Sequence, residues 1–337
     1  MAGNPVTLQD IADLLGLSRA TVSRALKDHP DISDNTKESV KKVAESLNYR
    51  PNLVASSLRH KKSKVIGLIV PQISYYFFPS VIHGIEKVVH KFGYNLLILQ
   101  SNEEYEREKE NLELLISNNV EGILASVART TTNFNHFSRV IDYGVPIVFF
   151  DRVVKNLDAD VVLLDDISGA YNSVKTLLEA GRRKIAICTG NLNLLISQNR
   201  LKGYKTALQE FGLPLHHEYI VSCEWPEEAE HETTELLNMT NPPDAIFAIS
   251  DLTMSGVMKA IHRKGLKIPD DISVIGFCED SFRTIYNPPL TAINPMGFEI
   301  GQKACEVLFE RIGKNQFVRL DPRVIYLDGP LMEGGSV

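Results

Sequence analysis

The chain has 337 residues, more than a single hydrophobic core usually supports, so its length predicts two or three domains. Apolar residues make up 44% and charged residues 23% of the sequence, as in ordinary globular proteins. No apolar run reaches the roughly eighteen residues of a membrane-spanning helix, and the first residues lack the basic flank and apolar stretch of a signal peptide. We therefore expect a cytoplasmic protein without a membrane partner.

Charge is distributed unevenly along the chain, whose net charge is −6. Residues 1–64 carry 11 Lys and Arg against 7 Asp and Glu, whereas the remaining residues carry 25 against 35. A basic head on an acidic body is typical of a protein in which only one end meets the phosphates of a nucleic acid. A small positive excess also occurs on solvated surfaces, so composition favours a DNA-binding head without requiring one.

The first fifty residues show the pattern of three short helices. The stretch 7–10 resembles a capping box, and apolar residues at helical spacing follow it. Gly16 breaks this helix, Ser18 is placed to cap a second one over 19–26, and a third follows Ser33. Two helices joined by a tight glycine-containing turn predict a helix-turn-helix, whose second helix enters the major groove of DNA.

The second of these helices offers side chains suited to DNA. Its exposed face holds Arg19, Thr21, Ser23 and Arg24, and its other face is apolar. Arginine makes the commonest specific base contact, to guanine, and small hydroxyls reach phosphates. The alternative is a plain three-helix packing module, because chance can produce the same pattern.

From residue 65 the sequence alternates between apolar runs and amphipathic helices. The runs are typical of parallel strands buried on both faces and occur at 65–70, 96–99, 122–125, 147–150, 161–164, 185–188, 245–249 and 273–277. Helical patterns between them include 81–92, 106–116, 170–178, 200–211 and 254–263. This alternation predicts doubly wound parallel α/β sheets, and about ten such units favour two lobes over one.

These motifs together resemble the LacI/GalR family of bacterial repressors. The resemblance rests on residues 7–12, 16–18, 20–26 and 48–52 in the head and on 66–71, 151–152, 200–204, 276–277 and 288–291 beyond it. The motifs follow the family order along nearly the whole chain. The implied fold is a small all-α helix-turn-helix head joined to an α/β two-lobed, periplasmic-binding-protein-like effector domain with parallel doubly wound sheets.

The resemblance also implies where the domains lie. The head covers 1–50, a hinge helix and linker cover 51–64, and the effector-binding and dimerisation domain covers 65–337. Lobe 1 is expected at about 65–163 and 296–324, and lobe 2 at about 164–295 and 325–337.

Individual residues of the head receive roles from the same resemblance. Arg19 and Ala20 occupy the two positions that most distinguish one member's operator from another's. The other expected DNA contacts are Thr7, Ser18, Thr21, Ser23, Arg24, Ser33, Thr36 and Tyr49, with Asn52, Ala55 and Leu58 in the hinge.

The hinge segment 52–58 is too short to be a stable helix alone, since isolated helices below about 12–15 residues are marginal in water. A second hinge and the DNA would order it, and Leu58 would then act as an apolar wedge in the minor groove. The alternative is that its apolar side chains cover a neighbouring core. The resemblance favours the wedge.

Candidate effector contacts follow the predicted strands. Ligands of open α/β sheets bind beyond the carboxyl ends of the strands and, in two-lobed proteins, between the lobes. The predicted contacts are Ser74, Tyr75, Tyr76, Asp151, Arg152, Arg200, Trp225, Ser250, Asp251, Cys278 and Glu279. Aromatic rings stack on the apolar face of a sugar or base, whereas we expect Phe77 and Phe78 to be core contacts.

Several of these residues carry alternatives. Arg200 opens an Arg-x-x-Gly-Tyr pattern and resembles the family arginine that clamps ligand oxygens. Asp151 would accept hydrogen bonds from hydroxyls, whereas Arg152 could instead close an interlobe ion pair. Trp225, the only tryptophan, aligns with an aromatic lid in some sugar-responsive members, or it plugs a core.

The predicted pocket departs from the family pattern at two positions. Cys278 stands where most relatives place a sugar-binding aspartate, for which Glu279 or Asp280 would compensate. Pro295 stands where some sugar-binding relatives have glutamine. We expect a sugar or related carbohydrate metabolite as effector, with a nucleoside, a purine or a protein corepressor as the alternative. A strongly anionic effector would need more cations than Arg152 and Arg200 supply.

Two other classes of protein share parts of this pattern. Many enzymes have α/β folds, but the sequence has no dinucleotide-binding, P-loop or nucleophile-elbow motif, and its nine histidines and four cysteines form no metal-ligand pattern. We therefore expect no catalytic residues, no cofactor and no metal. A soluble periplasmic sugar-binding protein is the more distant alternative, which would need a signal peptide and no basic head.

The expected partners are a pseudo-palindromic double-stranded operator, a small-molecule effector and a second copy of the chain. A homodimer would place two heads in successive major grooves and paired hinges between them. Effector binding would rotate the lobes and so change DNA affinity, which requires the ligand to prefer one lobe arrangement. The tail after residue 327 has no heptads, so we expect no C-terminal coiled coil.

Overall fold

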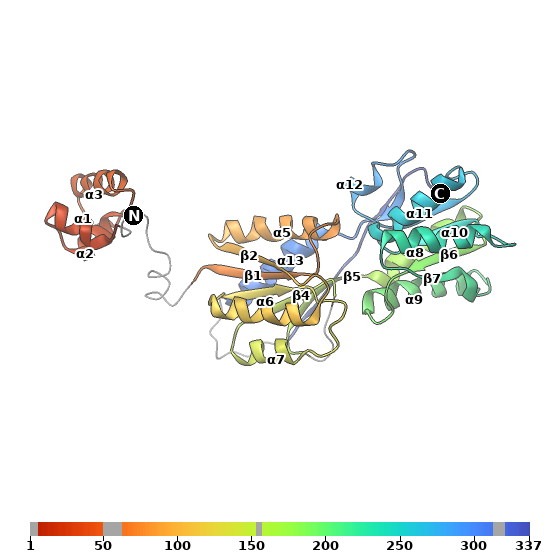
Figure 1. The fold of residues 1–337 in the computed structure, drawn as a ribbon, viewed down its shortest axis with the longest axis horizontal. Coiled ribbons are helices and arrows are strands. Elements are labelled where there is room, and N and C mark those ends of the chain that lie inside the picture. The colour runs from red at the N-terminus through yellow and green to blue at the C-terminus, as the bar shows by residue number, and fades with distance from the viewer. Residues whose placement is uncertain (1–5, 50–62, 153–156, 313–320) are drawn as a thin grey trace. The chain divides into compact units, whose positions relative to one another are not determined.

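The computed structural model describes residues 6–49, 63–152, 157–312 and 321–337, so the predicted hinge contacts Asn52, Ala55 and Leu58 lie outside the described residues. The chain divides into two compact units, Met1–Ser63 and Lys64–Val337 (Figure 1). In the described part of the chain, no helix is long and apolar enough to cross a membrane.

The N-terminal unit consists of the three helices α1 (Leu8–Leu15), α2 (Arg19–Ala25) and α3 (Asp34–Ser46). Gly16 ends α1 with a φ of +63°, which a glycine adopts without strain, and so allows the tight turn into α2. One apolar face of each helix forms the core, which is made of Ile11, Ala12, Val22, Ala25, Val40 and Ala44. The predicted helix-turn-helix is confirmed.

The first lobe of the second unit is built on a six-stranded parallel sheet in the order β11-β5-β4-β3-β1-β2. Its strands are β1 (Val65–Val70), β2 (Asn95–Gln100), β3 (Gly122–Ala125), β4 (Ile147–Phe150), β5 (Asp160–Leu164) and β11 (Val324–Leu327). One face of the sheet is covered by α5 (Phe77–Lys91) and α13 (Gly297–Ile312), and the other by α6 (Tyr105–Ser117) and α7 (Asn135–Asp142) (Figure 1).

The second lobe has a six-stranded sheet in the order β12-β10-β9-β8-β6-β7. Its parallel strands are β6 (Ile185–Thr189), β7 (Ile220–Ser222), β8 (Ala245–Ala248), β9 (Ser273–Phe277) and β10 (Thr291–Ile293), and β12 (Leu331–Met332) is antiparallel. Its helices are α8 (Asp166–Glu179), α9 (Leu195–Glu210), η1 (His217–Tyr219), α10 (Pro226–Asn238), α11 (Asp251–Lys264) and α12 (Asp280–Arg283). The predicted pair of doubly wound parallel sheets is confirmed, with one antiparallel edge strand added.

Helices α8 and α9 approach each other closely at Gly203, where a Cβ atom would lie 2.4 Å from the Ile167 carbonyl oxygen. The next residue, Tyr204, is buried, and its hydroxyl donates a hydrogen bond to the Ile185 carbonyl at 2.8 Å. The Arg-x-x-Gly-Tyr pattern therefore anchors α9 against both α8 and the sheet, and this fixes the position of Arg200 one turn earlier.

The chain passes between the lobes after β5, after β10 and after β11. Because β11 pairs with β5, residues 324–327 belong to the first lobe, and the predicted boundary at 324/325 is corrected to a position after Leu327. The last residues complete the second sheet. The buried Ser336 hydroxyl donates to the Val274 carbonyl at 2.6 Å and accepts from the Thr291 N–H at 2.8 Å.

Candidate DNA interface and effector pocket

Hydroxyl side chains begin all three helices of the head. Ser18 Oγ accepts from the Thr21 N–H at 3.1 Å, Ser33 Oγ accepts from the Thr36 N–H at 3.3 Å, and Thr7 forms a capping box at α1. The free N–H groups of a helix N-terminus are also where phosphate binds most readily. These predicted DNA contacts therefore stand where a phosphate can bind, and they also stabilise their helices.

Helix α2 divides its side chains as the sequence predicts. Val22 and Ala25 are completely buried, and Arg19, Ala20 and Arg24 are exposed. Thr21 and Ser23, which the sequence also predicts to be exposed, are half-buried. Neither arginine forms an ion pair with another described residue. Both guanidinium groups are therefore available to a base edge or a phosphate.

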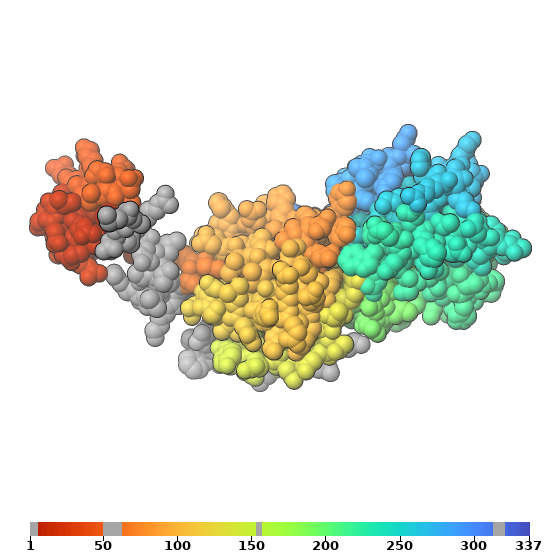
Figure 2. Space-filling model, viewed as in Figure 1, coloured from red at the N-terminus to blue at the C-terminus, as the bar shows by residue number. Residues whose placement is uncertain are grey.

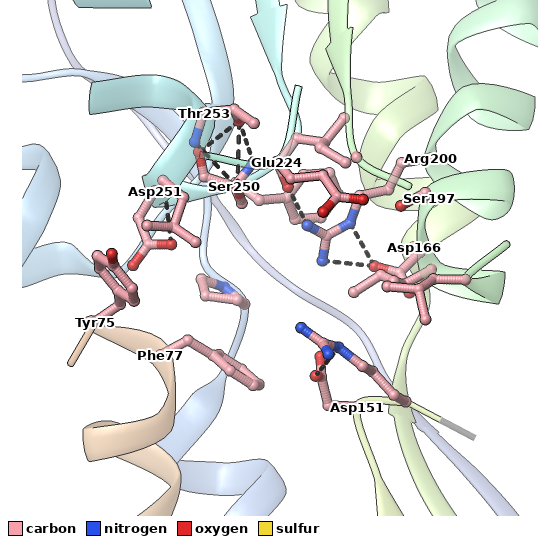
Figure 3. A pocket seen from close by; sticks show the side chains of 18 of the residues that line it. Tyr75, Phe77, Asp151, Asp166, Ser197, Arg200, Glu224, Ser250, Asp251 and Thr253 are labelled. Carbon is pink, nitrogen blue, oxygen red and sulfur yellow. Dashed lines mark hydrogen bonds and ion pairs between the residues drawn. The ribbon is translucent and has the colours of Figure 1, made fainter. Parts of the chain in front are cut away.

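A pocket lies between the two lobes, at the carboxyl ends of strands from both sheets (Figure 3). In the space-filling view the lobes touch along a shared boundary (Figure 2). The predicted residues that line the pocket are Tyr75, Asp151, Arg152, Arg200, Ser250, Asp251, Cys278 and Glu279. The rule that ligand contacts follow strands thus identifies residues from both lobes.

Three predicted contacts do not line this pocket. Ser74 is exposed, and the ring of Tyr76, which is 41% exposed, contacts Phe282 edge-on at 5.1 Å between centroids. Trp225 directly precedes α10, and its ring centroid lies 4.9 Å from the guanidinium carbon of Arg129. Trp225 therefore supports a residue of the pocket wall instead of forming a lid.

The two phenylalanines predicted as core contacts reach the pocket as well. Phe77 and Phe78 both line it, and both also pack in the core of the unit. Figure 3 shows Phe77 and Tyr75 on the same side of the pocket, so this wall offers apolar ring surface to a ligand.

Arg200 is held by a carboxylate from the neighbouring helix. Its Nε and Nη2 atoms lie 2.8 and 2.7 Å from Asp166 Oδ1, and Nη1 donates to the Ile249 carbonyl. The guanidinium group also lies over the ring of Phe277, 3.7 Å from the centroid. Burial raises the pKa of Asp166, and the charge of Arg200 opposes this rise. The structure therefore places Arg200 in the pocket wall with its guanidinium group bound to Asp166 and Ile249, and its contact with ligand oxygens stays a prediction. Asp166 is a residue that the sequence analysis did not include.

A second charged cluster links the lobes. Arg152 Nη1 donates to both carboxylate oxygens of Glu103, at 2.7 and 3.0 Å, and Arg129 pairs with Glu103 at 3.4 Å and with Glu224 of the other lobe. Burial alone would raise the pKa of Glu103, but the charges of Arg152 and Arg129 hold it below its usual value. Arg129, not Arg152, therefore makes the interlobe ion pair.

Three further carboxyl groups of the pocket have weaker partners. Asp151 lies 3.8 Å from the Nε atom of Arg152, and burial raises the pKa of Asp151 to about 6. Burial also raises the pKa of Glu279 to about 7 and raises that of Asp251. Asp251 Oδ2 is buried without a hydrogen-bond partner among the residues described. These groups can accept hydrogen bonds from a ligand.

The sequence could have revealed three more pocket residues, because ligand contacts are expected just after the carboxyl ends of strands. These residues are Glu103, Asp166 and Glu224, and each closely follows a strand. Arg129 lies no further beyond β3 than the predicted contacts Ser74 and Tyr75 lie beyond β1, so the same reasoning could have included it. Cys278, in the position of the family aspartate, is buried and contributes a thiol with a raised pKa, caused first by burial. The carboxylates of this pocket therefore come from positions other than 278, where the family resemblance implies an aspartate.

Comparison with known proteins agrees with this architecture. Residues 7–52 match the model of bacterial regulatory proteins of the lacI family, and residues 63–325 match that of periplasmic binding proteins and the sugar-binding domain of the LacI family. The ribose operon repressor of Haemophilus influenzae is 35% identical over 309 residues, covering 91% of this chain and 92% of the relative. The transcriptional repressor PurR of Vibrio atlanticus is 32% identical over 308 residues, covering 91% and 92%.

Among solved structures, the Lac repressor dimer bound to operator and the anti-inducer ONPF superposes with a TM-score of 0.86. The match covers 99% of each chain at 24% identity and therefore supports the fold. The family models span both units, and the head, the two sheets and the interlobe pocket agree with them. The chain belongs to the LacI family of bacterial regulatory proteins.

Proposed function

We propose that this DNA-binding transcription regulator represses its target genes as a homodimer whose operator affinity is controlled by a carbohydrate in the interlobe pocket. The observation that carries the proposal is the pocket itself, in which charged and aromatic side chains of both lobes converge. A ligand that contacts both lobes prefers one arrangement of them, which is the condition for coupling it to DNA binding. Such a protein acts in the cytoplasm and catalyses no reaction.

The chemistry of the pocket supports a carbohydrate. Phe77 and Tyr75 supply ring faces for the apolar side of a sugar ring. Asp151 and Asp251 supply acceptors for hydroxyl groups, and Arg200 supplies donors. The ribose operon repressor among the relatives supports the same class, whereas the PurR relatives support a purine as the second candidate.

We propose that DNA is contacted by the head residues identified from the sequence. Arg19 and Ala20 would discriminate between operators, and the helix-capping hydroxyls Ser18 and Ser33 would contact phosphates. The hinge contacts, including Leu58 as a minor-groove wedge, belong to the same proposal. This arrangement predicts a steep decrease of log K with log salt for operator binding.

The test is a thermal-shift screen of the full chain with sugars, sugar acids, sugar phosphates, nucleosides and purine bases. Each hit is then added to an operator-binding titration. We expect a carbohydrate to raise the melting temperature and to change operator affinity, and Arg200→Ala to abolish both effects. A response to purines alone would replace the carbohydrate by the second candidate. Hits that never alter DNA binding would contradict the regulatory role of the pocket.

A further inference from the structure

Every arginine of the pocket is already neutralised by a carboxylate of the protein. Arg200 is bound by Asp166, and Arg152 is bound by Glu103. Arg129 is shared between Glu103 and a carboxylate of the other lobe. A phosphate or carboxylate on a ligand would have to displace one of these pairs, and it would leave a buried acidic group of the protein uncompensated.

Asp251 and Glu279 are the carboxylates of the pocket that form no ion pair with a described Lys or Arg, although the more distant charge of Arg200 acts on Asp251. Asp251 Oδ1 accepts from the Leu252 N–H at 3.0 Å, while its Oδ2 atom is buried and has no partner there. Glu279 accepts two long hydrogen bonds, from the Gly297 N–H at 3.2 Å and from Ser80 Oγ at 3.4 Å. The two acids repel each other electrostatically, which adds to the effect of burial in raising the pKa of Glu279. Neither carboxylate therefore has its charge balanced by a direct ion pair.

Asp251 occupies one side of the pocket, and Glu279 lies against Ser80 of α5, the helix that begins with Phe77. In Figure 3, Asp251 lies on the side of Tyr75, away from the Arg200–Asp166 pair. A ligand that spans the pocket thus meets paired charges at one end and acceptors with unused capacity at the other. An alcohol brings one O–H donor to such a site, whereas an ammonium group brings three N–H donors and a full positive charge.

We propose that the effector carries a protonated amine held by Asp251 and Glu279 and hydroxyl groups directed toward Arg200 and Asp166. The ligand class is an amine-bearing carbohydrate or polyol, and phosphorylated and acidic sugars are excluded. This inference rests on the proposed function, in which the effector is a carbohydrate, and it assigns the charge and the orientation of that ligand.

The test measures calorimetric affinities of the full chain for matched pairs that differ only in an amine. The probes are glucosamine and glucose, galactosamine and galactose, mannosamine and mannose, and 1-amino-1-deoxysorbitol and sorbitol, together with glucosamine 6-phosphate. At neutral pH we expect at least one amine to bind tenfold or more tightly than its hydroxyl counterpart. The phosphate should bind more weakly than glucosamine.

Substitutions locate the effect. Asp251→Asn and Glu279→Gln each remove one acidic group, and each should reduce the amine preference severalfold while neutral-sugar affinity changes less. Glu299→Gln is the matched control, because Glu299 is an exposed acid that interacts electrostatically with Glu279 but does not line the pocket. This control should retain the full preference. Operator binding by each variant verifies that the protein is folded.

The outcomes separate this inference from the function on which it rests. If neutral sugars bind and no amine binds more tightly, the inference is wrong and the carbohydrate function stands. If the amine preference persists in both Asp251→Asn and Glu279→Gln, the assigned subsite is wrong. If none of the probes binds but a purine does, the inference and the carbohydrate function fail together.

Discussion

The head and the interlobe pocket place their functional side chains in opposite environments. In the head, Arg19 and Arg24 are exposed and the core is purely apolar. In the pocket, Arg200 is only 5% exposed and depends on Asp166 for its charge balance. A residue that reads DNA from the surface can change without cost to the fold. A residue of the pocket belongs both to the binding site and to the stability of its lobe.

The largest expected effect comes from breaking the Arg200–Asp166 pair. Removing one partner of a buried ion pair leaves an uncompensated charge, so Asp166→Ala should lower the free energy of unfolding of the effector unit by about 3–5 kcal/mol. Urea unfolding followed by fluorescence measures this unit alone, because Trp225 is the only tryptophan. The matched control is Asp142→Ala, which removes an exposed carboxylate at the end of α7. Equal unfolding midpoints for the two variants would show that the buried pair contributes no more to stability than an exposed carboxylate does. The pocket would then not differ from the head in this respect.

Periodicity predicts the architecture well because burial repeats along each element. It fails at the starts of the helices. The apolar pattern predicts helices from Val81 and Met254, whereas α5 begins at Phe77 and α11 at Asp251. These first turns follow the strand ends and hold polar or pocket-facing residues, so their side chains do not show the 3.6-residue period of a buried helix face. The segments that periodicity misses are thus part of the site.

Pairing between distant residues is the other part that the sequence does not reveal. Arg129 and Glu224 stand 95 positions apart, and no local spacing links them. Trp225 shows the same limit, because its position after a strand is compatible with a lid, a core plug or its observed contact with Arg129. Residues at strand ends can be nominated from the sequence, but their partners depend on how the two sheets face each other.

The second prediction concerns the exposed reader. Arg19→Ala should weaken operator binding roughly 10- to 100-fold, equivalent to about 1–3 kcal/mol for a lost base contact, and should relax preference at one base position. Competition binding with single-base operator variants measures both effects. Lys42→Ala, at an exposed cation of α3, should leave base preference unchanged. The free energy of unfolding of the head should stay the same in Arg19→Ala. A clear decrease would show that this DNA-contacting side chain also stabilises the fold of the head.

The smallest effect concerns the pH dependence of stability in the pocket. The pKa of Glu279 is raised to about 7 in the folded protein, from an ordinary value of 4.5, so the folded state keeps its proton longer than the unfolded state as pH rises. This contribution is present below about pH 4.5 and is lost as pH rises toward 7. Asp151, with a pKa raised to about 6, acts in the same direction.

The Glu279→Gln side chain cannot ionise, so this variant should lose less stability than the parent protein between pH 5 and 7.5. The expected difference is about 2–4 °C in melting temperature, as a shift of about 1 kcal/mol produces in a protein of this size. Melting curves of both proteins across this range measure the difference, with Glu299→Gln as the exposed-acid control. Parallel curves for the parent protein and Glu279→Gln would mean that this acid is as well solvated as the side chains of the head, and the contrast between the two regions would then rest on the ion pairs alone.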